Sequence, residues 1–178
     1  VEGDYIHHEL KKILIDQFDV GYTDDFGLKE LVENAAERLG EIALNKERKI
    51  VDRFMGELIK PEAGMASYGT VNVLRDLIVG AVEVLLISDG LKKQLIQYKC
   101  KTCANIWYNA LETPGPGKCP EDQGEGAIVE TKELIHGLSE LVRSYNTTME
   151  IISAESDQGS RLLKAFGGIA AILRYRPR

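Results

Sequence analysis

The sequence of 178 residues contains no long apolar run and no recognisable targeting segment. A membrane-spanning helix needs roughly 20 apolar residues in succession, and no stretch approaches that length. The first thirty residues also lack the basic start and apolar core of a secretory signal. We therefore expect a cytoplasmic location and no membrane partner. The chain begins at Val1 instead of a methionine, which suggests a fragment.

Aromatic residues and basic charge are also scarce. Only 7% of the residues are aromatic, and 22 Lys and Arg against 28 Asp and Glu give a formal net charge of -6 at pH 7. Because acid is in excess, we expect no strong direct binding of nucleic acid by this chain. The hydrophobic content of 44% is nevertheless ordinary for a chain that folds around a core.

Common catalytic signatures are missing from the sequence. It has no nucleophile elbow, no H-E-x-x-H zinc motif and no P-loop. His7 and His8 are adjacent, so on a helix they point about 100° apart and could not readily share one metal ion. His136 falls on a predicted helix without an acid–base partner set around it. We therefore expect that this chain is not an enzyme.

The apolar residues follow helical and strand periods in alternation. A long helix is predicted from Asp24 or Asp25 toward Ile59, followed by a loop at 61–69. After it, the ranges that read as helix are 70–80, 131–146 and 156–168, and those that read as strand are 81–88, 127–130, 148–153 and 169–175. Residues 91–97 fit either pattern. This alternation predicts an α/β fold, with a mixed sheet covered by helices.

The opening residues have a pattern of their own. Apolar residues recur at helical spacing from Tyr5 and Ile6 to Leu14. A short strand-like piece follows near Asp19 to Tyr22. We interpret this segment as the end of a preceding domain.

Three cysteines and one aspartate have the spacing of two metal-binding loops. Cys100-x-x-Cys103 is followed by Cys119-x-x-Asp122, with Asp122 where a zinc ribbon usually has its fourth cysteine. Each short loop would present two ligands to one tetrahedral ion. A structural zinc is the favoured interpretation, and a metal-free loop or a redox pair are the alternatives. A catalytic zinc is not expected, because acid–base residues are few in this segment.

The stretch AFGGIAAILRY, residues 165–175, contains a glycine pair that could mark a phosphate loop, a turn or a docking surface. In a phosphate-binding loop the glycines precede a helix, so that its free amides face the anion. Here Gly167 and Gly168 follow a helical pattern and precede a strand-like one. The pair is therefore predicted to end a helix, where the dipole is negative.

Several stretches together resemble the C-terminal domain of the archaeal and eukaryotic class-one peptide chain release factors. They are KERKIVDRFMGEL at 46–58, MASYG at 65–69, GAVEVLLISDGL at 80–91 and the segment 145–176, which contains F-G-G-I-x-x-I-L-R-Y. The resemblance covers essentially the whole chain. The chain resembles an archaeal member, and archaeal members often have four cysteines where this chain has three and Asp122.

The resemblance implies an architecture and a function. The fold would be an α-β-α sandwich akin to the kink-turn-binding ribosomal proteins, with a small inserted zinc-ribbon-like subdomain. Residues 1–23 would end the middle domain, 24–99 and 127–178 would form the C-terminal domain, and 100–126 the insertion. That domain would dock a translational GTPase of the elongation factor one alpha type on the ribosome during translation termination. The ribosome-recycling ATPase would be a later partner.

The resemblance also assigns the residues at the C-terminal end. The segment that matches the GTPase-binding part of the family comprises Phe166, Gly167, Gly168, Ile172, Leu173, Arg174 and Tyr175. The family's catalytic Gly-Gly-Gln motif is absent, because Ile169 follows the glycine pair. Phe166, Ile172 and Leu173 could instead be core residues, since only half of a strand's side chains can face a partner.

Two other functions remain open from the sequence. One is the C-terminal domain of Pelota, a ribosome-rescue factor, which generally lacks the cysteine-bearing insertion. The other is an RNA-binding module like the ribosomal proteins of related fold, which the acidic composition disfavours.

Overall fold

The computed structural model describes residues 7–61 and 64–177. The chain divides into two compact units, Val1–Asn45 and Lys46–Arg178, and the long helix α2 (Asp25–Leu58) contributes to both. None of the helices described combines the length and the apolar character needed to cross a membrane.

The first unit contains α1 (His8–Ile13) and the beginning of α2. The Asp24 carboxylate accepts the N–H groups of Phe26 and Gly27, so Asp24 caps α2 as the sequence predicts. The predicted strand at Asp19–Tyr22 is wrong, because this segment is irregular and no described strand of the unit lies beside it to pair. Tyr5 and Ile6, which we placed in the first helix, lie outside the described residues.

The second unit is built on a four-stranded sheet with the order β1-β8-β2-β7. Its strands are β1 (Ala66–Tyr68), β2 (Val82–Ser88), β7 (Thr148–Ile152) and β8 (Ile169–Leu173). β2 pairs in parallel with β7 and antiparallel with β8, which makes the sheet mixed. The predicted α/β class with a mixed sheet is therefore confirmed. β1 lies in the range predicted as a loop, and that prediction is wrong there.

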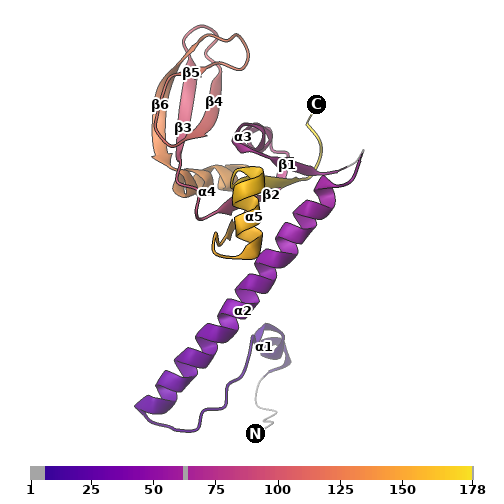
Figure 1. Ribbon diagram of the computed structural model, residues 1–178, viewed down its shortest axis with the longest axis vertical. Coiled ribbons are helices and arrows are strands. Elements are labelled where there is room, and N and C mark those ends of the chain that lie inside the picture. Colours follow the sequence, from indigo (N-terminus) through magenta and orange to yellow (C-terminus); the bar gives the residue numbers. More distant parts are fainter. Residues whose placement is uncertain (1–6, 62–63, 178) are drawn as a thin grey trace. The chain divides into compact units, whose positions relative to one another are not determined.

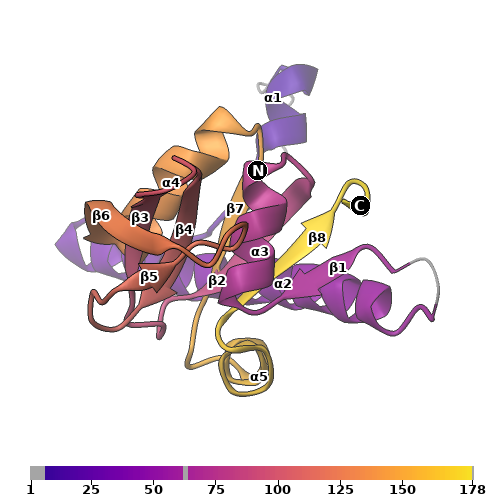
Figure 2. The same cartoon turned by 90° about the horizontal axis from the view of Figure 1, so that it is seen from above.

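Helices cover both faces of this sheet. On one face, α3 (Thr70–Ile78) and α4 (Leu134–Ser144) pack over Leu85 and Ile87. On the other, the last turns of α2 and α5 (Asp157–Phe166) pack over Val84 and Leu86. Figure 2 shows α3 and α5 on opposite sides of β2 and β8. The alternation along β2 thus separates two apolar cores.

A second sheet lies next to α4 (Figure 1). It is antiparallel, with the order β4-β3-β6-β5, and consists of β3 (Gln94–Cys100), β4 (Ile106–Leu111), β5 (Gly117–Lys118) and β6 (Glu125–Glu133). β3 begins before residue 100 and β6 ends after residue 126, so this sheet extends beyond the expected insertion limits 100–126. Leu95 and Ala110 join the core under α3 and α4. The ambiguous residues 91–97 therefore contain the start of a strand.

Candidate functional site

The four residues singled out by their spacing come together at the end of the small sheet. The sulfur atoms of Cys100, Cys103 and Cys119 and a carboxylate oxygen of Asp122 all lie within 4.8 Å of one another. Cys100 and Cys119 are buried, whereas Cys103 and Asp122 are exposed. Three sulfurs and one carboxylate form a donor set that could hold a metal ion.

The two loops that carry these residues have the same backbone geometry. Cys100 N–H donates to the carbonyl of Asn105 at 2.8 Å, and Cys119 N–H donates to that of Gly124 at 2.9 Å, each five residues further on. The residue that follows Cys103, Ala104, and the residue that follows Asp122, Gln123, both have a left-handed backbone, with φ of 59°. Asp122 therefore occupies in the second loop the position that Cys103 occupies in the first.

Two donor pairs have separations close to those of a tetrahedral zinc site. The sulfurs of Cys103 and Cys119 are 3.6 Å apart, and the Cys100 sulfur is 3.4 and 3.5 Å from the two carboxylate oxygens of Asp122. Around a tetrahedral zinc ion, two sulfurs stand about 3.8 Å apart, and a sulfur and an oxygen about 3.6 Å apart. The residues present thus fit zinc without rearrangement of these pairs.

Backbone N–H groups point at the cluster and favour its charged form. The N–H of Gly124, at 2.9 Å, and then the thiol of Cys119 hold the pKa of Asp122 at about 2. The N–H groups of Cys103 and Thr102 lower the pKa of Cys100 against the effect of desolvation.

Cys103 has the opposite shift. The N–H of Asn105 lowers its pKa, but desolvation and the neighbouring Cys100, Cys119 and Asp122 outweigh this and raise it to about 12. A cation bound among the four ligand atoms would lower the pKa of Cys103 instead, because it stabilises the thiolate.

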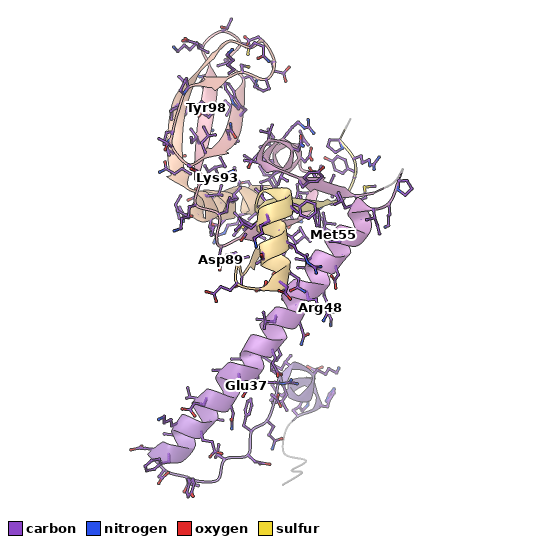
Figure 3. The ribbon with its side chains drawn as sticks, viewed as in Figure 1. Glu37, Arg48, Met55, Asp89, Lys93 and Tyr98 are labelled. Atoms are coloured by element: carbon purple, nitrogen blue, oxygen red, sulfur yellow. The ribbon has the colours of Figure 1, made fainter. Side chains whose placement is uncertain are left out.

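An aromatic stack lies within the small sheet. Tyr98, labelled in Figure 3, is fully buried, stacks on Trp107 at 5.3 Å and donates its hydroxyl to the carbonyl of Gly115 at 2.8 Å. A Cβ at Gly117 would stand 2.7 Å from the Tyr98 ring, and one at Gly126 would stand 2.5 Å from Trp107. These contacts were not predicted, although aromatic residues facing glycines across a strand pair are a signal for them.

The glycine pair near the C-terminus ends α5, as predicted. Gly167 and Gly168 have φ of 72° and 77°, and the N–H of Gly168 donates to the carbonyl of Leu162 at 3.0 Å. Phe166 precedes them and lies edge-on to two further rings, Phe54 at 5.2 Å and Tyr68 at 5.4 Å. Tyr68 is 48% exposed, so this aromatic group reaches the surface.

The remaining residues of the expected docking segment are used inside the unit. Ile172 and Leu173 are buried in opposite cores, so their side chains do not face a partner in this fold. The Arg174 guanidinium donates to three backbone carbonyls at the ends of α3 and α4, those of Gly80, Tyr145 and Asn146. The Tyr175 hydroxyl donates to the carbonyl of Val79 at 2.6 Å. The burial of Ile172 and Leu173 agrees with the alternative that they are core residues, whereas these hydrogen bonds of Arg174 and Tyr175 were not predicted.

Comparison with known proteins places the chain in a family. Residues 44–177 match the family model described as eRF1 domain 3. The peptide chain release factor subunit 1 of Methanocaldococcus jannaschii is 43% identical over 185 residues, covering 99% of this chain and 44% of that protein. This chain therefore spans less than half the length of that relative.

Two solved structures extend the comparison. The C-terminal domain of a peptide chain release factor from Methanosarcina mazei is 36% identical and has a TM-score of 0.66, covering 87% of this chain and 98% of that one. An archaeal Pelota, in a ribosome-bound structure with ABCE1, has a TM-score of 0.54 at 21% identity, over 90% of this chain and 35% of that one, which shows a shared fold. The chain belongs to the archaeal and eukaryotic release factor 1 family, and residues 44–177 are its domain 3.

Proposed function

We propose that this chain is the part of a release factor that recruits a translational GTPase of the elongation factor one alpha type to the ribosome in translation termination. The observation that carries the proposal is the match of residues 44–177 to domain 3 of the family. The chain has no Gly-Gly-Gln motif, so its own contribution is binding and not peptidyl-tRNA hydrolysis. The ribosome-recycling ATPase is a later partner in this proposal, supported by the shared fold with a Pelota seen together with ABCE1.

The docking surface that the geometry favours is the aromatic group at the end of α5. Phe166 is half-buried between Phe54 and Tyr68, and the Tyr68 ring is exposed. Aromatic side chains held by packing dominate the binding energy of many interfaces, because they are immobile before the partner arrives. Gly167 is exposed beside them. Arg174 donates instead to carbonyls at the ends of α3 and α4, the helices on the other face of the sheet.

A pull-down with the purified GTPase in its GTP form tests this proposal. Phe166→Ala and Tyr68→Ala should each weaken binding by about 2 kcal/mol, as expected for hot-spot residues. The matched control is Val129→Ala, which truncates another exposed apolar side chain on the small sheet and should leave binding unchanged. Thermal unfolding of each variant separates lost binding from lost structure.

The Arg174→Ala variant distinguishes contact from support. If Arg174 acts only by holding the ends of α3 and α4, binding should fall together with stability, whereas a direct contact would weaken binding alone. Equal binding by Phe166→Ala, Tyr68→Ala and the wild type would remove this surface assignment. No binding by the wild type would contradict the recruitment function.

For the cysteine cluster we propose a structural zinc ion held by Cys100, Cys103, Cys119 and Asp122. The donor spacing and the two equivalent loops support it. When bound, the ion would cross-link the two loops that carry these residues. Metal analysis of the purified chain should find about one zinc per chain. A Cys119→Ser variant should lose it, and a chain that binds no zinc after reconstitution would contradict the proposal.

A further inference from the structure

The fourth donor of the cluster, Asp122, differs from the three cysteines in chemistry and from Cys100 and Cys119 also in exposure. Cys100 and Cys119 are buried, with 3% and 0% of their surface exposed. Asp122 is exposed and offers a carboxylate, a harder donor than a thiolate and a weaker one for zinc. Cys103 is exposed too, but its sulfur lies 3.6 Å from that of Cys119.

We infer that Asp122 is the ligand through which the metal ion enters and leaves this cluster, and that it sets the preference of the cluster for zinc over softer ions. The inference rests on the proposed zinc site. A thiolate in this position would close the cluster with four soft donors, whereas the carboxylate leaves one side hard and open to water.

The backbone already has the geometry that a fourth cysteine would need. Asp122 is followed by a left-handed residue, Gln123, as Cys103 is followed by Ala104. The N–H of Gly124 donates to Asp122 Oδ1 at 2.9 Å and fixes the orientation of the carboxylate. Exchange of Asp122 for cysteine therefore changes the donor atom and leaves the loop as it is.

Gly124 is a positioning residue for this ligand. A Cβ at Gly124 would stand 3.0 Å from Asp122 Oδ1, 3.0 Å from Thr102 Oγ1 and 3.3 Å from the Cys100 sulfur. The absence of a side chain lets the second loop approach the first closely enough for both to share an ion. A Gly124→Ala variant should weaken metal binding by about 10–100-fold, the usual effect of disturbing groups that orient a ligand.

The test measures metal transfer from the zinc-loaded full chain. Release to an excess of the chromophoric chelator 4-(2-pyridylazo)resorcinol gives the exchange rate, and competition between zinc and cadmium gives the selectivity. Asp122→Cys should slow release severalfold and shift the competition toward cadmium, whereas Asp122→Asn should speed release. The matched control is Glu121→Gln, which neutralises the neighbouring exposed carboxylate outside the cluster and should leave both measurements unchanged.

The outcomes separate this inference from the zinc site itself. Zinc bound by the wild type, with the same release rate and the same selectivity in Asp122→Cys, would overturn the role of Asp122 alone. An effect of Glu121→Gln as large as that of Asp122→Asn would also overturn it, because surface charge would then explain the result. A wild type that binds no zinc would overturn both proposals. Circular dichroism of each variant confirms that it is folded, and Asp122→Asn serves if Asp122→Cys does not fold.

Discussion

The two sheets of the second unit are stabilised in different ways. In the mixed sheet, β8 is buried at every position and β2 at all but one, because helices cover both faces. In the small sheet, β6 is exposed along most of its length. Apolar burial alone accounts for the first sheet. The second has too small a core for that, a situation in which small structures use a metal ion or disulfides.

The small sheet is held at two ends that differ in chemistry. At its base, Leu95 and Ala110 belong to the apolar core beneath α3 and α4. At its tip, the chain depends on the Tyr98–Trp107 stack and on the cysteine cluster. We therefore expect that the tip can unfold while the mixed sheet stays folded. Trp107 is the one tryptophan of the sequence, so its fluorescence reports on the tip while far-ultraviolet circular dichroism reports mainly on the helices around the mixed sheet.

The largest effect is expected from a cavity in the mixed sheet. Leu86 in β2 is fully buried among Val51, Phe54 and Leu162, so Leu86→Ala should lower the free energy of unfolding by about 2–5 kcal/mol. Urea titration followed by circular dichroism measures it. Val129→Ala on the exposed β6 is the control and should change stability by no more than about 0.5 kcal/mol. Equal losses in both variants would mean that the two sheets do not differ in this way.

A smaller and more local effect is expected from removal of the proposed zinc ion. A chelator, or Cys119→Ser, should lower the urea midpoint followed by Trp107 fluorescence and speed amide hydrogen exchange between Cys100 and Gly126. The circular dichroism transition should stay in place, because Leu85 and Leu86 do not depend on the cluster for their burial. A common shift of both transitions would show instead that the two sheets unfold as one unit.

The sequence predicts the mixed sheet better than it predicts the small one. The elements α3, β2, α4, β7, α5 and β8 all fall within the ranges expected from apolar periodicity, because each buries a regular face. β1 was missed because it has only three residues between glycine-containing turns, and its strand conformation depends on β8 beside it. Local pattern carries no information about such a partner.

At the candidate sites the same limit applies. The spacing of the cysteines was sufficient to predict the four-residue cluster, because two short loops with fixed geometry place their metal-ligating atoms together. The hydrogen bonds of Arg174 and Tyr175 could not be predicted, because their acceptors are carbonyls at the ends of α3 and α4, 28 to 96 residues away in the chain. The local sequence around an arginine and a tyrosine is the same whether their side chains bind a partner or donate hydrogen bonds to carbonyls at helix ends.

The smallest effect is expected from the loss of one hydrogen bond within the tip. Tyr98→Phe keeps the ring stacked on Trp107 but removes the hydrogen bond to the carbonyl of Gly115, which should cost about 0.5–1.5 kcal/mol. The loss should appear in the Trp107 fluorescence transition and not in circular dichroism. Tyr22→Phe, at a tyrosine that is 67% exposed, is the control and should change neither.

The pH dependence of the same variant gives a second measurement. Burial raises the pKa of Tyr98 above its ordinary value of 10.0. The folded tip thus retains the phenol proton more tightly than the unfolded chain, so its contribution to stability is complete below pH 10 and is lost as the pH rises through the folded pKa. As the pH rises above 10, the wild-type fluorescence midpoint should therefore fall by more than that of Tyr98→Phe, which has no phenol proton to lose. Parallel declines in both proteins would mean that the buried hydroxyl does not stabilise the tip.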